Sequence, residues 1–509
     1  MPTAPLAELS RIVGDDRVST RHSDRVATSR DCWQRDILGV REGETPPGPE
    51  VVVWPASTKE VSQIVALATK RGMTVIPFGG GSGVCGSARA SMAPPSLGPG
   101  SEQGTILLDL KRLTAIRSLD ANRGEAWIET GVNGEILERE LNHRGFTLGH
   151  FPSSIYCSTL GGFVAARSAG QLSTKYGKIE DMILALELVL PSGEIVVLED
   201  EVTQLFVGAE GTLGVCTAAR VRVKRLAEEQ ILRAYSFKGV ERGLEAIRAL
   251  LQSGLRPAVV RLYDEFDTVM ALSGKKGAKK KKKPSLGGEL FGLFPAMKNS
   301  AIAIALKKPA ALNRLAGVLG DRALLILMFE GPKTGTRLEA AEAERILGRM
   351  SATDLGSAPA ERWKSRRYAI SYNQSKVFAA GAFNDTAEVA STWDRLPALY
   401  EGVKKAVGRH AFIMAHFSHA YAEGCSIYFT FVGQAPTADA ARVLYDRIWS
   451  DLLRAVVDAG GTLSHHHGVG LSKARFLPEE LGPGGMKALQ ALKKAIDPSR
   501  AFNPGKLGL

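Results

Sequence analysis

The feature that most constrains the fold is a strand–helix–strand unit that leads directly into a run of glycines. Residues 51–54 predict an apolar strand, residues 57–71 an amphipathic helix opened by a capping box, and residues 73–76 a second strand. The chain then enters a glycine loop, Pro77-Phe78-Gly79-Gly80-Gly81-Ser82-Gly83. Without Cβ atoms in the way, its backbone N–H groups can converge on an anion. The spacing fits neither a Walker A nor a Rossmann loop, so a plain turn and a phosphate cradle both stay open.

Length and composition limit the class of protein. A chain of 509 residues is too long for one hydrophobic core and predicts two or three domains. The absence of an eighteen-residue apolar run argues against a membrane span, and the first residues lack the pattern of a signal peptide. The five cysteines are odd in number and widely spaced, which favours free thiols in a reducing cytosol over disulfides or a zinc site.

The net charge of +12 is mostly local. Seven lysines lie between Lys275 and Lys283, and without them the charge is 12 − 7 = +5. Because Phe291 and Phe294 follow closely, we expect residues 273–298 to form a mobile lysine-rich loop that contacts an anionic membrane surface. Nucleic-acid binding is not expected, since neither aromatic interleaving nor a binding motif accompanies the basic run.

Two further segments are rich in small residues. Residues 152–181 contain Thr159-Leu160-Gly161-Gly162-Phe163 and then Tyr176-Gly177-Lys178-Ile179-Glu180-Asp181. Residues 207–215 read Val207-Gly208-Ala209-Glu210-Gly211-Thr212-Leu213-Gly214-Val215. Small residues let a flat cofactor lie close to the backbone. Each segment alone also fits an ordinary packed turn.

Together, the glycine loop and these two segments resemble the FAD-binding domain of the vanillyl-alcohol oxidase (PCMH) type, in order and in separation. The resemblance covers residues 47–225 and implies FAD with its pyrophosphate on backbone N–H groups. Covalent members carry a histidine in or beside the glycine loop, where this chain has Ser82-Gly83-Val84, so non-covalent FAD is implied. The residues implied to bind FAD are Pro77, Phe78, Gly79, Gly80, Gly81, Ser82, Gly83, His150, Ser153, Ser154, Ser158, Thr159, Gly162, Ala166, Arg167, Ser168, Ala169, Glu210, Gly211, Thr212, Leu213, Gly214, Val215 and Cys216.

Three consecutive histidines, His465, His466 and His467, lie between glycines late in the chain. The flanking glycines disfavour a helix and suit a tight turn that points imidazoles into a cavity. Histidine can donate, accept or carry charge near neutral pH, so the cluster is a candidate site. Metal binding is not expected, because three consecutive side chains rarely reach one ion and no further ligand set is evident.

The motif Ser464-His465-His466-His467-Gly468-Val469-Gly470 resembles that of the alkyldihydroxyacetonephosphate synthase family, flavoenzymes that make the ether bond of ether lipids. Hydroxy-acid dehydrogenases of the same fold have a Gly-Glu-His-Gly motif instead. The interval from Tyr428 to His465, 465 − 428 = 37 residues, also fits the family. Further likenesses are Arg261-Leu262-Tyr263-Asp264, Cys425-Ser426-Ile427-Tyr428-Phe429 and His150 ahead of the flavin segment. The resemblance runs from about residue 47 to residue 509.

This resemblance implies an α+β fold in four parts. They are a helical lead-in at 1–46, an FAD-binding PCMH-type domain of two subdomains at 47–225, an α/β cap (substrate) domain at 226–458, and a C-terminal segment at 459–509 that returns to the flavin. In the lead-in, Asp15, Asp16 and Ser19 are the expected helix starts. Periodicity predicts cap-domain helices at 239–254, 338–350, 395–408 and 437–458 and strands at 323–330 and 427–431. His416 and His419 are expected to precede a strand and to be structural.

The family implies an FAD-dependent enzyme that exchanges the acyl group of acyl-dihydroxyacetone phosphate for a fatty alcohol, without net oxidation. Tyr428 would transfer the proton, while Arg261, His465, His466 and His467 would stabilise developing charge. The alternative is an FAD-linked dehydrogenase or oxidase acting on a 2-hydroxy acid or another alcohol.

The substrate-binding residues depart from the family pattern. Counted back from Trp393, Gln374 stands where the family has its phosphate-binding arginine. Glutamine cannot form a bidentate charged clamp, so either Arg366, Arg367 or Lys376 replaces it or the substrate lacks a phosphate there. The expected partner is a lipid-like small molecule. The expected location is the cytoplasm, with a face that touches a membrane, and a homodimer stays open.

Overall fold

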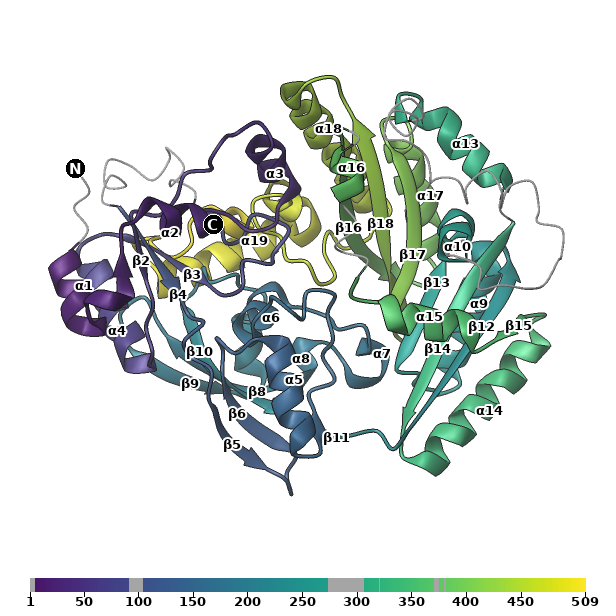
Figure 1. Ribbon diagram of the computed structural model, residues 1–509, viewed down its shortest axis with the longest axis horizontal. Coiled ribbons are helices and arrows are strands. Elements are labelled where there is room, and N and C mark those ends of the chain that lie inside the picture. The colour runs from purple at the N-terminus through teal and green to yellow at the C-terminus, as the bar shows by residue number, and fades with distance from the viewer. Residues whose placement is uncertain (1–4, 91–103, 273–305, 320, 370–374, 380) are drawn as a thin grey trace. The chain divides into compact units, whose positions relative to one another are not determined.

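The computed structural model describes residues 5–90, 104–272, 306–319, 321–369, 375–379 and 381–509 (Figure 1). The lysine-rich loop expected at 273–298 and the side chain of Gln374 lie outside the described residues. The chain divides into two compact units. The first comprises Met1–Gly170, Gly177–Leu226 and Ser464–Leu509, and the second comprises Gln171–Tyr176 and Ala227–Leu463.

The first unit contains two main sheets and a two-stranded ribbon. One sheet has the order β1-β2-β4-β3, with β2 and β3 parallel to β4. The other is antiparallel with the order β5-β6-β10-β8-β9, and β7 pairs with β11. The strands are β1 Val18–Ser19, β2 Val51–Val53, β3 Thr74–Phe78, β4 Thr105–Asp109, β5 Ile116–Asp120, β6 Glu125–Glu129, β7 Phe146–Thr147, β8 Ile183–Val189, β9 Ile195–Glu199, β10 Val215–Arg222 and β11 Lys224–Arg225.

The lead-in of the first unit is helical, but its helices do not start where expected. Asp15 begins a short 3₁₀ turn, and Ser19 ends strand β1, which pairs with β2. That pairing requires extended backbone, so no helix can begin at Ser19. The helices of this unit are α1 Leu6–Val13, α2 His22–Ala27, α3 Gln34–Val40, α4 Thr58–Lys70, α5 Gly134–His143, α6 Leu160–Ala166, α8 Ile179–Met182 and α19 Leu477–Ile496.

Helix α4 of the predicted strand–helix–strand unit contacts β3 of one sheet and β8 and β9 of the other. The Ser57 hydroxyl accepts a hydrogen bond from the Glu60 N–H group at 3.2 Å, as expected for an N-cap. The expected capping box is incomplete. The Glu60 carboxylate accepts from the Ala56 N–H group at 2.7 Å and pairs with Arg17 at 2.9 Å, so it ties the helix start to the lead-in.

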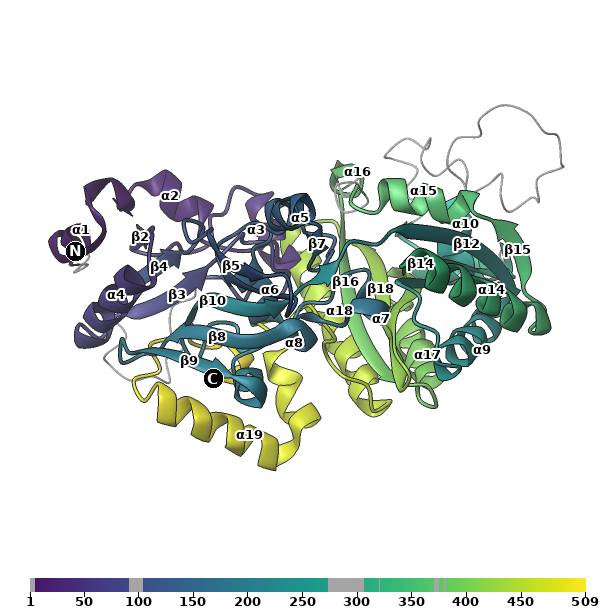
Figure 2. The same ribbon diagram turned by 90° about the horizontal axis from the view of Figure 1, so that it is seen from below.

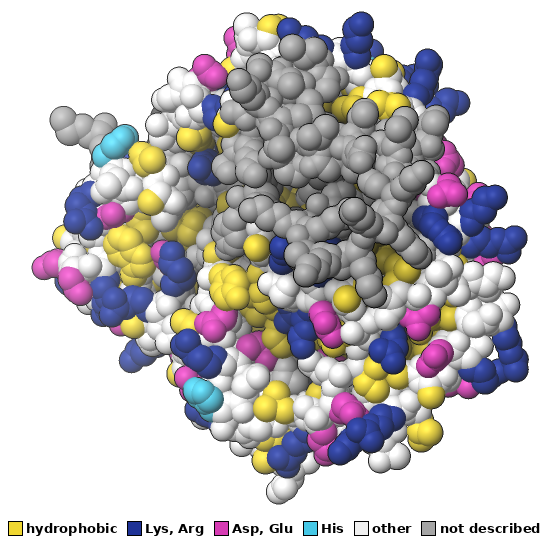
Figure 3. All heavy atoms as spheres, turned by 45° about the vertical axis from the view of Figure 1, so that its right-hand side comes forward, with side chains coloured by type: hydrophobic (Ala, Val, Ile, Leu, Met, Phe, Trp, Pro, Cys, Tyr) yellow, Lys and Arg dark blue, Asp and Glu magenta, His cyan; other side chains and the backbone are white. Residues whose placement is uncertain are grey.

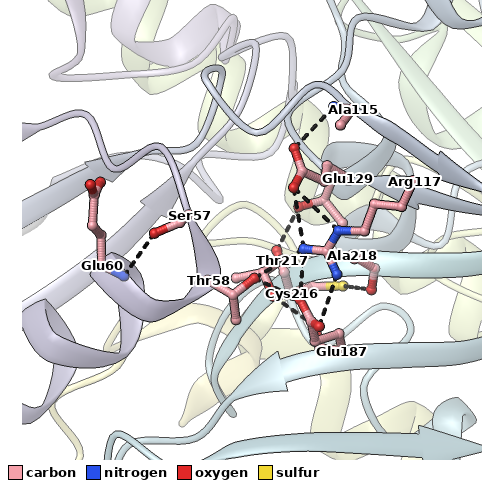
Figure 4. A network of polar contacts seen from close by, with 11 residues as sticks. Ser57, Thr58, Glu60, Ala115, Arg117, Glu129, Glu187, Cys216, Thr217 and Ala218 are labelled. Atoms are coloured by element: carbon pink, nitrogen blue, oxygen red, sulfur yellow. Dashed lines mark hydrogen bonds and ion pairs between the residues drawn. The ribbon is translucent and has the colours of Figure 1, made fainter.

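A polar network joins α4 to the five-stranded sheet (Figure 4). The guanidinium of Arg117 in β5 donates to both carboxylate oxygens of Glu187 in β8, at 2.9 and 3.1 Å. Glu187 also accepts from the hydroxyls of Thr58 at 2.6 Å and Thr217 at 2.8 Å. Bidentate Arg–carboxylate pairs fix geometry as well as charge. The network therefore holds α4, and with it the strand that enters the glycine loop.

Buried polar contacts fasten the C-terminal segment to the rest of the first unit, and the yellow ribbon lies among its purple and blue elements (Figures 1 and 2). Phe502 forms a parallel bridge with Val75 of β3. The Lys493 ammonium is 2% exposed and donates to the Thr212 carbonyl, the Asp497 carboxylate and the Phe502 carbonyl, at 2.6, 2.6 and 2.9 Å. Such pairing is what makes a buried charge tolerable.

The second unit is built on a seven-stranded sheet with the order β15-β12-β14-β13-β17-β18-β16. All its recorded strand pairs are antiparallel, so helices and strands alternate here without parallel crossovers among the described residues. The strands are β12 Glu229–Lys238, β13 Val259–Tyr263, β14 Arg322–Gly331, β15 Thr353–Gly356, β16 Ala382–Thr392, β17 Phe412–Ala420 and β18 Gly424–Gln434. The predicted strands at 323–330 and 427–431 are confirmed within β14 and β18.

The predicted helices of the second unit are confirmed, although α14 begins five residues before its predicted start at 338. Helices α17 and α18 contact β18, and α9 and α14 contact β12 and β14. Basic and acidic side chains are interspersed over the face seen in Figure 3. The helices are α7 Ser173–Tyr176, α9 Gly239–Gln252, α10 Glu265–Leu272, α13 Pro309–Leu319, α14 Lys333–Arg349, α15 Ala358–Arg366, α16 Ser375–Ala379, α17 Leu396–Val407 and α18 Ala438–Asp458. Among the described residues, no helix is both long and apolar enough to cross a membrane.

Candidate functional site

The glycine loop packs tightly against the small-residue segment. A Cβ atom at Gly79 would overlap the Thr159 hydroxyl, and one at Gly80 would overlap the carbonyl oxygen of Cys157. Gly81 has a φ of +62°, in the left-handed region that favours glycine. Glycine is therefore required at these positions by close backbone approach and by conformation. The structure brings together two of the three predicted cofactor segments.

The backbone N–H groups of residues 79–83 are only half-buried, and no acceptor for them is recorded among the described residues. Adjacent N–H groups of this kind form an anion-binding concavity. A cavity of about 580 Å³ borders the loop within the first unit. Its wall includes Gly80, Gly81, Phe78, Trp54 and Lys111. Backbone donors beside a cavity that is lined by the rings of Phe78 and Trp54 fit a ligand with both an anionic and an aromatic part.

The small-residue segment continues into helix α6, where the Thr159 hydroxyl accepts from the Gly162 N–H group at 3.2 Å. His150 is 1% exposed, and its Nε2 lies 3.0 Å from the Ser168 hydroxyl. Burial, assisted by the charge of His466, lowers the pKa of His150 to about 3, so this imidazole is neutral at physiological pH. Its ring lies 4.6 Å from that of Phe163. His150 is thus a rigid neutral group within the segment.

The third predicted segment meets the C-terminal motif through Glu210. Its carboxylate accepts from the N–H groups of Val469, at 2.6 Å, and Gly470, at 3.0 and 2.9 Å. A Cβ atom at Gly468 would overlap the same carboxylate. Burial raises the pKa of Glu210, whereas these N–H groups lower it. Gly211 lies against the ring of Pro77, where a Cβ would come within 2.9 Å. The glycine loop, the third segment and the part of the small-residue segment that belongs to the first unit therefore converge with the C-terminal motif.

The three histidines of the motif are half-buried and lie edge to face. The Nδ1 atoms of His465 and His466 are 3.1 Å apart, and the two rings are perpendicular. The rings of His466 and His467 have centroids 4.7 Å apart and an interplanar angle of 78°. The contact between the two Nδ1 atoms fixes the rings of His465 and His466 relative to one another.

Other predicted cofactor residues have varied surroundings. Ser153 is exposed, and the Ser154 and Ser158 hydroxyls lie 2.9 Å apart. Arg167 has a φ of +53° and pairs with Glu180 at 4.0 Å. Cys216 lies in β10 with its thiol against the Ala218 carbonyl. Those that line or adjoin the interior of the unit are Ala166, Ser168, Ala169, Thr212, Leu213, Gly214 and Val215.

The first unit fits FAD on three observations made above. The glycine loop offers unpaired backbone donors for a pyrophosphate, the neighbouring segments exclude Cβ atoms, and the adjoining cavity carries aromatic walls. The loop contains no histidine for a covalent link. Residues 79–83 could hold the pyrophosphate, and His150 and Glu210 make buried contacts within the neighbouring segments.

In the second unit, strand register places four polar side chains in one row. Tyr263 of β13 pairs with His416 of β17, His416 with Tyr428 of β18, and Tyr428 with Glu388 of β16. Directly paired residues point to the same sheet face. Phe417 and Phe429 point to the other face, where Tyr400 of α17 contacts both. The row therefore lies on the face opposite α17.

Charges cluster around this row. The Arg261 guanidinium lies 5.1 Å from the Tyr263 ring centroid, and its Nε is buried with no hydrogen-bond partner among the described residues. Asp267 of α10 lies 3.3 Å from Nδ1 of His416. Burial raises the pKa of Tyr428, while a hydrogen bond with Thr386 and the charge of Arg261 lower it. Asp385 and Glu388 also raise it, so the phenol lies near one cation and two anions. A phenol whose pKa is set by such neighbours can take part in proton transfer.

Several expectations for the second unit need correction or stay untested. His416 and His419 do not precede a strand, because both lie within β17, where alternating side chains bring His416 onto the polar face. Arg366 is exposed at the end of α15, and Gln374 is outside the described residues. Sequence reasoning missed Asp267, whose role depends on how α10 meets β17. Its only sequence signal is its place three residues after Arg261-Leu262-Tyr263-Asp264.

Comparisons with known proteins agree with these observations. The family model described as FAD binding domain matches residues 49–199, and FAD linked oxidases, C-terminal domain, matches residues 226–507. Alkyldihydroxyacetonephosphate synthase of Trypanosoma brucei brucei is 30% identical over 517 residues, 98% of this chain and 80% of that relative. The synthase of Dictyostelium discoideum is 30% identical over 93% of this chain and 75% of that relative. An uncharacterised FAD-linked oxidoreductase of Escherichia coli is 26% identical over 98% and 97% of the two chains.

Solved structures give the same result. An alkyldihydroxyacetonephosphate synthase superposes with a TM-score of 0.78 at 27% identity, over 99% of this chain and 85% of that chain. p-Cresol methylhydroxylase shares the fold, with a TM-score of 0.70 at 13% identity over 99% and 96% of the chains. The predicted α+β fold with a PCMH-type FAD-binding domain is confirmed, and FAD is the cofactor. The chain belongs to the alkyldihydroxyacetonephosphate synthase family of flavin-dependent enzymes.

Proposed function

We propose that the enzyme exchanges the acyl group of acyl-dihydroxyacetone phosphate for a fatty alcohol, the reaction of ether-lipid synthesis. The observation that carries the proposal is the extent of its similarity to named synthases, which includes both units and the motifs within each. FAD, when bound, would supply an electrophilic ring beside the substrate carbon from which the acyloxy group leaves and to which the alkoxy group is added. The chain's own residues must then bind the lipid, move a proton and stabilise charge.

We assign the proton transfer of this reaction to Tyr428, which lies in the second unit. As a phenolate it takes the hydroxyl proton of the fatty alcohol, and as a phenol it can return that proton to a departing group. Arg261, which lies near Tyr428, favours the charged form of the phenol and offers a buried, unpaired Nε to an anionic substrate oxygen. In the first unit, His465, His466 and His467 are assigned to stabilising charge that develops on the substrate.

Binding of the substrate phosphate is assigned to the region of Arg366 and Gln374. Arg366 is exposed and cationic, and a guanidinium can grip a phosphate with two hydrogen bonds. Replacing Arg366 by Ala should raise KM for the phosphate-bearing substrate while kcat changes little. An unchanged KM would exclude Arg366 from phosphate binding.

The second candidate is an FAD-linked oxidoreductase, and one sequence feature favours it: Gln374 stands where the family has its phosphate-binding arginine. Anaerobic mixing separates the candidates. The synthase should incorporate a labelled long-chain alcohol into palmitoyl-dihydroxyacetone phosphate with release of palmitate, and 2-hydroxy acids should leave the flavin oxidised. Bleaching of the flavin by a 2-hydroxy acid, with no exchange of the labelled alcohol, would sink the synthase proposal.

We also propose that the enzyme is cytoplasmic and touches a membrane. Its proposed substrate is a lipid, and lysines lie between Lys275 and Lys283, with Phe291 and Phe294 beyond them. Vesicles of phosphatidylserine should retain the intact enzyme, and deletion of residues 275–294 should release it. Equal binding of both proteins would remove the membrane contact from the proposal. The mass of the holoenzyme in solution decides between a monomer and a homodimer.

A further inference from the structure

We infer that Asp267 and His416 form a positioning pair that holds a positive charge against the face of the Tyr428 ring and so favours the phenolate. The inference rests on the proposed role of Tyr428 and adds two residues to it. Neither Asp267 nor His416 belongs to the motifs that the sequence analysis singled out as catalytic. Both come from the polar face of the second unit's sheet.

The geometry of the two rings is the first observation. The imidazole of His416 and the phenol of Tyr428 are stacked, with centroids 4.7 Å apart and an interplanar angle of 18°. The stacking follows from strand pairing, since the two residues lie directly opposite in β17 and β18. An imidazolium over an aromatic face is attracted by the ring, and more strongly when the ring carries the negative charge of a phenolate.

The second observation is the carboxylate behind the imidazole. The Oδ2 atom of Asp267 lies 3.3 Å from Nδ1 of His416, and the His416 side chain is only 9% exposed. A carboxylate at this distance favours the charged form of histidine. Burial raises the pKa of Asp267 to about 6, and Arg261 opposes that rise, so Asp267 is an anion at neutral pH. A protonated His416 would therefore present its charge to the Tyr428 ring, with the Asp267 carboxylate behind it.

Asp264 fixes Asp267 in this position. One oxygen of the Asp264 carboxylate accepts from the N–H group of Asp267 at 2.8 Å, at the start of α10. The other oxygen accepts, at 2.9 Å, from the N–H group of Ala415, the residue before His416. Asp264 is 0% exposed, so both bonds are shielded from water. A single buried carboxylate thus fixes the start of α10 against β17 and aligns Asp267 with His416.

Other charged groups near Tyr428 act in known directions. Arg261 of β13 favours the phenolate, whereas Asp385 and Glu388 of β16 oppose it. Tyr263 of β13 lies on the far side of His416, with ring centroids 5.9 Å apart. Without a second cation, Arg261 alone would have to offset the effect of Asp385 and Glu388 on the pKa of Tyr428. The Asp267–His416 pair supplies that cation.

The test is a spectroscopic titration of Tyr428, which needs no substrate. The chain has 10 tyrosines, so the tyrosinate absorbance of each holoenzyme is compared with the same protein carrying Tyr428→Phe. His416→Asn and Asp267→Asn should each raise the apparent pKa of Tyr428 by about one unit or more. Because the two residues act through one pair, the double variant should show no shift beyond the larger single one.

The control is a pair of the same type elsewhere in the second unit. His410, in the turn after α17, lies 2.9 Å from Asp451 of α18, and neither residue belongs to the row. Asp451→Asn should leave the titration of Tyr428 unchanged. A titration unaltered in either His416→Asn or Asp267→Asn, as a folded holoenzyme, or altered equally in Asp451→Asn, overturns the inference. The two variants change different elements, so one folded, FAD-loaded variant is enough to decide.

Failure of the proposed function gives a different result. If the enzyme does not exchange alcohol for acyl but the Tyr428 titration shifts as expected, the positioning pair stands and the reaction assignment falls. If exchange occurs with the titration unmoved, the reaction stands and the pair is structural. An alkaline shift of the pH profile of kcat/KM in Asp267→Asn, restored toward wild type by Asp267→Glu, adds support that a purely structural role would not give.

Discussion

Glu210 and Gly470 lie 260 residues apart in the chain, yet the N–H group of Gly470 is within 3.0 and 2.9 Å of the two carboxylate oxygens of Glu210. Replacing Glu210 by Ala leaves this buried N–H group and the part-buried N–H group of Val469 without their acceptor. We expect a loss of about 3 kcal/mol of stability, since each unsatisfied donor costs about 1–3 kcal/mol. Glu210→Gln keeps one acceptor oxygen, so its stability should lie between that of wild type and that of Glu210→Ala. Melting temperature and flavin content measure the effect, and an unchanged Glu210→Ala protein would contradict it.

Gly80 is the position of the glycine loop with the least room. Gly80→Ala would push a Cβ atom into the Cys157 carbonyl, so the loop must move away from the small-residue segment. We expect FAD content to fall by at least tenfold, read from the ratio of flavin to protein absorbance. Gly484→Ala is the matched control, because a Cβ there meets no atom within 4 Å. Full flavin content in Gly80→Ala would refute the assignment of the loop.

Tyr428→Phe removes the phenol oxygen and keeps the ring stacked on His416. The proposed role predicts that kcat for alkyl exchange falls by about 10²–10⁴-fold, the usual range for loss of a general acid or base. FAD content and melting temperature should stay close to those of wild type. Tyr235→Phe changes another buried tyrosine of the same sheet and should retain activity. Retained activity in Tyr428→Phe would move the proton transfer to another group.

His150 predicts a pH dependence of stability. Its folded-state pKa of about 3 lies below the unfolded value of about 6.5, so the unfolded chain binds the extra proton first. The stability it contributes is present above about pH 6.5 and is lost as pH falls toward 3. At about pH 4.5 the loss amounts to roughly 3 kcal/mol. Melting curves at about pH 5 and about pH 7.5 should therefore differ more for wild type than for His150→Gln. Equal differences would mean that folding does not lower the pKa of His150.

The cofactor segments could be predicted from sequence because their signals are local. Gly79 and Gly80 leave no room for a Cβ atom, and Gly81 needs its positive φ, and such glycines are visible as a run in the chain. The polar row of the second unit could not be predicted in the same way. It depends on which residue of β17 faces Tyr428, and a shift of one residue would send His416 to the opposite face. The position of Asp267 is even harder to predict from the sequence, because it depends on the hydrogen bonds by which Asp264 joins α10 to β17.

The bridge between Val75 and Phe502 also has a consequence for synthesis of the enzyme. A ribosome makes β3 and the glycine loop 502 − 75 = 427 residues before the segment that pairs with β3. During that interval the whole second unit emerges and can fold on its own, while the first unit still has an uncovered strand edge. Such edges invite non-native pairing in nascent chains. Cofactor loading should therefore be a late event, and truncation of the last residues should yield flavin-free, aggregation-prone protein.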